Sequence, residues 1–151
     1  MSADGLVNLP PARSGTGLDY LQRIVSGEYP QVPIGDTLNF RITEASLGRV
    51  VLVGKPDLRS FNLLGTVHGG WAASILDTAM ALAAMSTLDA SNRHTTLDIR
   101  INYLRPITLE TGEVRAEVAL LHDLVNASEG FARCERLGDA ALAGGLLLRL
   151  R

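Results

Sequence analysis

The sequence has very little cysteine and no excess of charge of one sign, and each absence excludes a class of protein. Cys134 is the single cysteine, so an intramolecular disulfide framework and a thiolate metal cluster are excluded. Lysine and arginine number 14 and aspartate and glutamate 16, which argues against a protein that binds nucleic acid by neutralising phosphates. The longest apolar run, residues 69–88, is interrupted by Asp77, and a central aspartate is penalised in lipid. We therefore expect a protein that binds neither nucleic acid nor membrane.

The length of 151 residues suits one folded domain with a sizeable core. Glycine and proline dominate the start of the chain, and the only regular pattern in residues 1–35 is a short helical one near residues 18–26. We therefore expect an N-terminal irregular segment with a short helix, residues 1–35, and a main domain, residues 36–151. The first residues include Asp4 and lack a basic segment followed by an apolar core, so they do not have the pattern of a secretory signal, and we expect a cytoplasmic protein.

Hydrophobic residues alternate with polar ones in several segments, which is the period of a half-buried β-strand. This alternation covers residues 38–43, 97–103 and 113–120, and residues 49–53, 131–136 and 142–150 are the other expected strands. One long apolar helix, beginning at Gly69, separates the second segment from the third. The pattern predicts an α+β domain in which an antiparallel sheet of five or six strands wraps round one long central helix.

The stretch from Asn62 to Asp77 holds the residues that could take part in a chemical reaction. Gly69 and Gly70 are unfavourable inside a helix but suit its start, where the first backbone N–H groups have no partner within the helix. Those groups and the positive end of the helix dipole favour developing negative charge. Asp77 is the only charged side chain between Gly69 and Leu88, and a carboxylate in so apolar a helix is costly unless a partner stabilises it. That cost indicates that Asp77 has a function, the alternative being a buried carboxylate that caps neighbouring backbone.

Two segments, residues 62–77 and 95–106, together resemble the hotdog-fold acyl-CoA thioesterases. The nearest branch is the PaaI type, named for phenylacetate degradation, to which the 4-hydroxybenzoyl-CoA thioesterases are related. The resemblance rests on an asparagine, a His-Gly-Gly six residues later, an acidic residue nine after the histidine and a strand that ends in Arg-Pro. It implies a hotdog fold, protomers paired edge to edge as a homodimer or a dimer of dimers, and active sites at the dimer interface.

The resemblance also implies roles for single residues. Asp77 would be the nucleophile or the general base, and would face the backbone N–H of Gly69 in the partner protomer, which would polarise the thioester carbonyl. Asn62 would hold the water or the carboxylate, and His68 would orient the loop or donate a hydrogen bond. The remaining implied residues are Thr96, which would support the reacting group, and Gly70 and Arg105, which would bind CoA, Arg105 through a phosphate.

The sequence leaves the chemistry partly open. Ala81 stands where the branch with a catalytic glutamate has a threonine, which favours the branch with aspartate, and the register between Thr95 and Thr96 is open by one residue. The predicted activity is hydrolysis of an aryl- or medium-chain acyl-CoA thioester to free acid and CoA. The alternatives are a hotdog hydratase or dehydratase and a non-catalytic acyl-CoA-binding sensor. No cofactor is expected beyond the CoA of the substrate, and no metal, because the three histidines lack the spacing of a zinc site.

Overall fold

The computed structural model describes residues 15–89, 92–120, 127–136 and 139–150. In chain order the helices and strands are α1 (Gly17–Val25), α2 (Pro33–Leu38), β1 (Phe40–Ser46), β2 (Arg49–Gly54), η2 (Leu58–Ser60), α3 (Gly69–Ser86), β3 (Arg93–Asn102), η3 (Leu109–Thr111), β4 (Val114–Leu120), β5 (Ala127–Arg136) and β6 (Asp139–Leu150).

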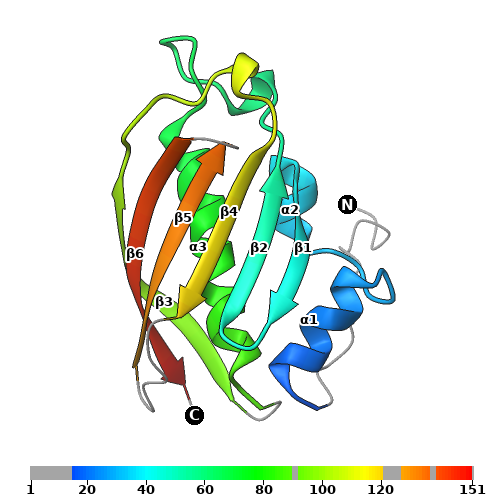
Figure 1. The fold of residues 1–151 in the computed structure, drawn as a ribbon. Coiled ribbons are helices and arrows are strands. Elements are labelled where there is room, and N and C mark those ends of the chain that lie inside the picture. Colours follow the sequence, from blue (N-terminus) through cyan, green and yellow to red (C-terminus); the bar gives the residue numbers. More distant parts are fainter. Residues whose placement is uncertain (1–14, 90–91, 121–126, 137–138, 151) are drawn as a thin grey trace, which may run out of the picture.

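The strands form one antiparallel sheet of six, in the order β1-β2-β4-β5-β6-β3. The sheet curves round α3, which packs against every strand (Figure 1). β1 and β3 are therefore the two edges, although they lie on opposite sides of α3 in the sequence. The predicted α+β architecture, a sheet wrapped round one long helix, is confirmed, with six strands.

Helix α3 supplies most of the core. It begins at Gly69, as the sequence predicts, and most of its residues are buried against the sheet. After the two glycines of its first turn, the residues that stay partly exposed fall at helical spacing on one face, and all are small or polar: Ala73, Ser74, Asp77, Thr78 and Ala81. We call this set the small-residue face of α3. Within the described residues, no helix is both long enough and apolar enough to cross a membrane.

The segment before β1 differs from the sequence prediction. The alternation at residues 38–43 placed Leu38 in the first strand, but Leu38 ends α2, and Asn39 follows in the left-handed conformation with φ 55°. Pro33 is the first residue of α2, a position where its missing N–H costs no helical hydrogen bond. The end of α2 is tied to α3, because the Trp71 indole N–H donates to the Leu38 carbonyl at 2.7 Å.

Helix α1 packs against both β1 and α3. A capping box between Thr16 and Asp19 fixes its start. Gly17 comes so close to α3 that a Cβ there would lie 1.8 Å from the Met85 carbonyl oxygen. The short helix predicted near residues 18–26 is confirmed. The boundary predicted after residue 35 falls inside α2, and the division into 1–35 and 36–151 stays a prediction.

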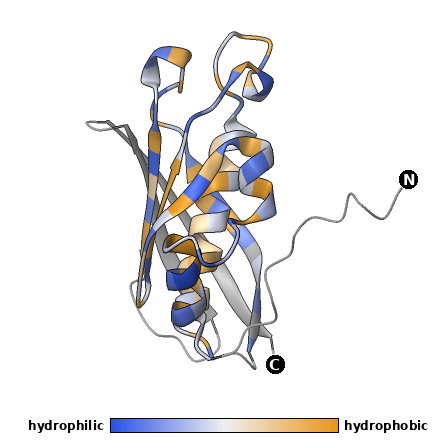
Figure 2. Ribbon diagram, turned by 90° about the vertical axis from the view of Figure 1, so that its right-hand side faces the viewer, coloured by the Kyte–Doolittle hydropathy of each residue, from blue (hydrophilic) through white to orange (hydrophobic). Residues whose placement is uncertain are grey.

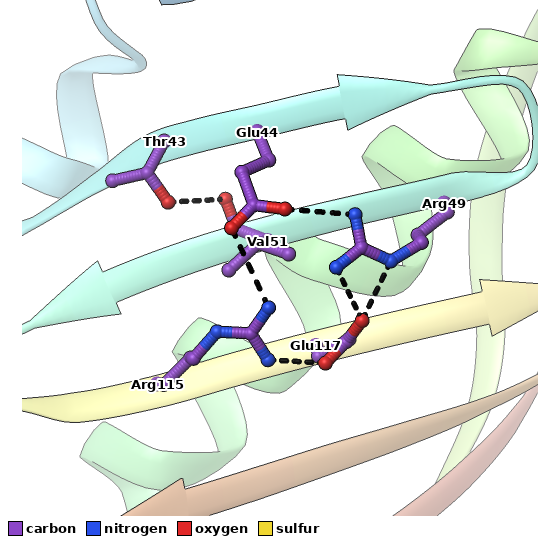
Figure 3. Close-up of polar contacts among 6 residues, drawn as sticks. All are labelled: Thr43, Glu44, Arg49, Val51, Arg115 and Glu117. Carbon is purple, nitrogen blue, oxygen red and sulfur yellow. Dashed lines mark hydrogen bonds and ion pairs between the residues drawn. The ribbon is translucent and has the colours of Figure 1, made fainter. Parts of the chain in front are cut away.

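The outer face of β1, β2 and β4 carries a closed ring of charges (Figure 3). Arg49 contacts both Glu44 and Glu117, and Arg115 contacts the same two carboxylates. Hydrogen bonds from Arg49 lower the pKa of Glu44 below its usual value, and hydrogen bonds from Arg115 do the same for Glu117. All four side chains remain at least 30% exposed, so this face of the sheet is a solvated one.

Candidate active site

The first turn of α3 leaves one backbone group free. His68 donates its N–H to the Ser60 carbonyl at 2.7 Å and accepts from Trp71 N–H at 2.9 Å. The Gly70 N–H donates to His68 Nδ1 at 2.9 Å, so His68 caps the helix and its neutral ring carries the proton on Nε2. In the part of the chain that the structure describes, no group accepts a hydrogen bond from the Gly69 N–H. Of the two glycines, Gly69 therefore offers the donor for an oxyanion.

A cavity of about 290 Å³ opens beside this helix start. Its walls come from the end of the loop before α3, from the first turn of α3 and from the segment after β3. The lining residues are Val67, His68, Gly69, Ala72, Tyr103, Leu104, Arg105, Pro106 and Ile107. Most of these residues are apolar, and Gly69, whose N–H has no acceptor among the described residues, is one of them.

The two loops that flank the cavity project at the same end of the molecule (Figures 1 and 2). The first precedes α3 and the second joins β3 to β4. A hydrogen bond from Val67 N–H to the Ile107 carbonyl, 2.9 Å long, joins the two loops. Both loops carry fully or largely exposed leucines, among them Leu63 and Leu64 in the first loop and Leu104 in the second.

Asp77 lies on the small-residue face of α3, and its carboxylate has a partner. Thr96 Oγ1 donates to Asp77 Oδ1 at 2.7 Å. The period of β3 alone would point Thr96 away from the helix, because Ile99 and Ile101 point inward. A bulge between Thr96 and Asp98 inserts one residue and turns Thr96 to the helix side. The structure thus resolves the register in favour of Thr96, while Thr95 is exposed.

Asn62 is engaged within its own loop. Its Oδ1 accepts from the N–H groups of Leu64 and Thr66, at 2.9 and 3.3 Å, and its Nδ2 donates to Thr66 Oγ1 at 2.9 Å. These bonds form an Asx-type turn that shapes the loop before His68. None of them reaches Asp77, so within one chain Asn62 supports the loop, and its predicted part in catalysis stays a prediction.

Asp77 and Gly69 are not brought together within one chain. Asp77 lies eight residues after Gly69 in the same helix, a rise of about 12 Å. Asp77 is also absent from the lining of the cavity beside Gly69. One chain therefore holds two half-sites, the Gly69 cavity and the pair of Asp77 with Thr96. This separation agrees with the expectation that Asp77 faces the Gly69 of a partner protomer.

Arg105 lines the Gly69 cavity and is exposed, so a phosphate could reach its side chain. The Gly70 N–H, by contrast, already donates a hydrogen bond to His68. Among the described residues, no three His, Cys, Asp or Glu side chains gather closely enough to hold a metal ion. The expectation of no cofactor stays a prediction.

Tyr103 belongs to the site and was missed by the sequence analysis. Its position in the alternation of residues 97–103 assigned it to the inward face of the third strand, but β3 ends at Asn102. Tyr103 instead bends over the start of α3, where its hydroxyl donates to the Gly69 carbonyl at 2.9 Å. No signal in the sequence marks this contact, because it joins residues 34 positions apart.

Comparisons with known proteins agree with this geometry. The model of the Thioesterase superfamily matches residues 64–122, which include the Gly69 cavity, Asp77 and Thr96. A phenylacetic acid degradation-related protein from Ralstonia eutropha is 25% identical, with a TM-score of 0.76 over 85% of this chain and 98% of that one. A mutant PaaI from Thermus thermophilus is 25% identical, with a TM-score of 0.71 over 79% of this chain and 100% of that one. The Escherichia coli PaaI protein is 19% identical, with a TM-score of 0.77 over 90% and 97%. No curated protein matches the sequence.

These similarities show that the chain has a hotdog fold, and its residues 64–122 match the Thioesterase superfamily. The resemblance to the PaaI-type thioesterases is likewise confirmed.

Proposed function

We propose that this protein is an acyl-CoA thioesterase that hydrolyses an aryl- or medium-chain acyl-CoA to a free acid and CoA in the cytoplasm. The observation that carries the proposal is the Gly69 N–H at the start of α3, which has no acceptor among the described residues and belongs to the lining of a mostly apolar cavity. Such a donor stabilises the oxyanion of a thioester under attack, and removing one oxyanion donor costs roughly a hundred- to a thousandfold in rate.

In this proposal the thioester carbonyl oxygen accepts from Gly69 N–H of one protomer, and Asp77 of the other attacks the carbonyl carbon or activates a water. The oxygen of the nucleophile bonds to carbon, the C–S bond breaks, and the CoA thiolate leaves and takes a proton. With Asp77 as nucleophile, water then hydrolyses the resulting anhydride. The hydrogen bond from Thr96 fixes one carboxylate oxygen and leaves the other for the reaction.

The proposed assembly is a homodimer through β3. The edge of β1 is occupied, because the Gln31 side-chain amide bonds both the N–H and the carbonyl of Ile42, at 2.8 and 3.2 Å. The edge of β3 is open, because β6 is the only described strand that pairs with it. A ten-residue open edge favours addition of another strand. A two-fold axis at this edge would bring two copies of α3 side by side and could join the two kinds of half-site.

The charges on β3 favour one register for that pairing over the two adjacent ones. A two-fold axis normal to the sheet keeps each side chain on its face, so the register must centre on a residue. Centred on Ile99, it places Asp98 opposite Arg100 of the second copy, twice. Centred on Asp98 or on Arg100, it places like charges directly opposite each other, which is destabilising. We therefore propose pairing centred on Ile99.

The acyl group is proposed from the walls of the cavity and from the similar proteins. Val67, Ala72 and Ile107 give the cavity an apolar lining that suits an aryl or alkyl chain. The phenylacetic acid degradation proteins among the similar structures favour an aryl-acetyl group as the first substrate to test.

The test is thiol release from a panel of aryl- and alkyl-CoA esters. Asp77→Asn keeps the shape of the side chain and removes its basicity, so kcat should fall by about a hundredfold or more, the scale of a positioned acid–base group. Asp36→Asn, which changes an exposed carboxylate on α2, is the matched control and should keep wild-type rates. Absence of thiol release from every ester, or full activity of Asp77→Asn, would refute the proposal. Binding of acyl-CoA without turnover would favour the sensor, and hydration of an enoyl-CoA would favour the hydratase.

A further inference from the structure

The peptide between Gly69 and Gly70 is held from both ends by side chains. Its N–H donates to His68 Nδ1 at 2.9 Å, and its carbonyl accepts from the Tyr103 hydroxyl at 2.9 Å. His68 directly precedes Gly69 in the sequence, so its contact with this peptide is local. Tyr103 reaches the same peptide from the segment that follows β3, which also lines the cavity.

The space around both glycines is limited by these two side chains rather than by backbone conformation. Neither Gly69 nor Gly70 is among the glycines with positive φ, so the backbone would accept another residue. A Cβ on Gly69 would lie 3.1 Å from Tyr103 Cζ and 3.2 Å from its hydroxyl oxygen. A Cβ on Gly70 would lie 2.9 Å from His68 Nδ1. The tyrosine ring therefore packs directly on the Gly69 backbone.

This contact acts on the residue that carries the free N–H. The hydroxyl holds the Gly69 carbonyl while the ring limits movement of its Cα, so the orientation of the Gly69 backbone depends on Tyr103. An oxyanion donor must lie within a few tenths of an ångström of the developing charge to give its full effect. The ring itself is not buried, since Tyr103 is 54% exposed, so it contributes little to the core.

We propose that Tyr103 is a positioning residue for catalysis, which holds the Gly69 N–H toward the thioester carbonyl through its hydrogen bond to the Gly69 carbonyl. The inference rests on the proposed thioesterase function and extends it to a residue that does not touch the reacting atoms. It predicts a loss in kcat rather than in KM, because the hydroxyl points at the protein backbone and not at the substrate.

The experiment is steady-state thiol release by Tyr103→Phe, which keeps the ring and removes only the hydroxyl. Loss of one hydrogen bond of this kind should lower kcat about three- to tenfold, with KM within twofold and an unchanged unfolding temperature. Tyr29→Phe is the matched control, since it removes a phenolic hydroxyl whose contact is to Arg23 on α1, and should behave as wild type.

Three results would overturn the inference while leaving the thioesterase in place. They are a wild-type kcat in Tyr103→Phe, a raised KM with unchanged kcat, and a loss of kcat that only follows a loss of folded protein. A wild-type enzyme that releases no thiol from any ester would instead refute the proposed function, and the role of Tyr103 with it.

Discussion

Reversal of one charge on β3 tests whether two copies pair about Ile99. Asp98 and Arg100 have side chains that are 51% and 87% exposed, and they contact each other within the strand at 3.1 Å. In the proposed dimer Asp98 of each copy also faces Arg100 of the other copy across the two-fold axis. Asp98→Lys therefore converts two cross-strand attractions into two repulsions.

The expected magnitude follows from the number of pairs. A cross-strand pair of opposite charges contributes roughly 0.2–1 kcal/mol, and exposure keeps it toward the lower end. Two pairs that change from attraction to repulsion alter the free energy of dimerisation by about four times one pair, or roughly 2 kcal/mol. The dimer Kd should therefore rise about thirtyfold, and the difference should shrink at high salt because exposed charges are screened.

Sedimentation velocity over a dilution series measures this Kd. The double variant Asp98→Lys with Arg100→Asp restores opposite charges in the same register, so it should dimerise within about threefold of wild type. Glu28→Lys, a reversal at a similarly exposed carboxylate near α1, should leave the Kd unchanged. Equal Kd values for wild type and Asp98→Lys, or failure of the double variant to recover, would refute the register.

Two further predictions concern stability. Ser86→Ala should lower the free energy of unfolding, measured in urea, by about 1–2 kcal/mol. The reason is that the buried Ser86 hydroxyl accepts from the Gly48 N–H at 2.7 Å and ties the β1–β2 turn to α3. The control Ser74→Ala loses only a hydrogen bond within its own helix and should change the free energy of unfolding by less than about 0.5 kcal/mol. Acidification should also destabilise the protein, because the pKa values of Glu44 and Glu117 are lowered in the folded state. Their contribution to the free energy of unfolding is complete above the usual glutamate pKa and is lost as the pH falls from there through the lowered pKa of the folded state. Urea titrations at pH 7 and pH 3.5 should show a smaller pH effect in a Glu44→Gln, Glu117→Gln double variant than in wild type; equal effects would contradict the role of the charge ring.

The sequence predicted the elements whose burial follows a regular period. β4 and α3 match the expectation because alternation and a continuous apolar run report burial directly. The exceptions arise where one residue breaks the period. The alternation predicted a strand from residue 38, but Pro33 begins a helix that includes Leu38, and Asn39 ends that helix in the left-handed conformation before β1.

The candidate site was predictable only where its residues are close in sequence. His68 and Gly69 define a helix start by composition alone. Thr96 could be placed on Asp77 only after the bulge in β3 was seen, because a bulge has no signature in a single sequence. The contact of Tyr103 with Gly69 depends on the path of the chain after β3, and the local sequence pattern does not determine that path.

The amide of Gln31 has a consequence for how large an assembly of this chain can become. A sheet with two open edges can add copies at either end without limit, as a growing ribbon, whereas a sheet with one sealed edge stops after a single addition. By satisfying both backbone groups of Ile42, one glutamine side chain obstructs strand addition at β1, so in the proposed assembly growth is directed to β3. The contact at β1 thus favours a finite size for an assembly that forms by pairing strands.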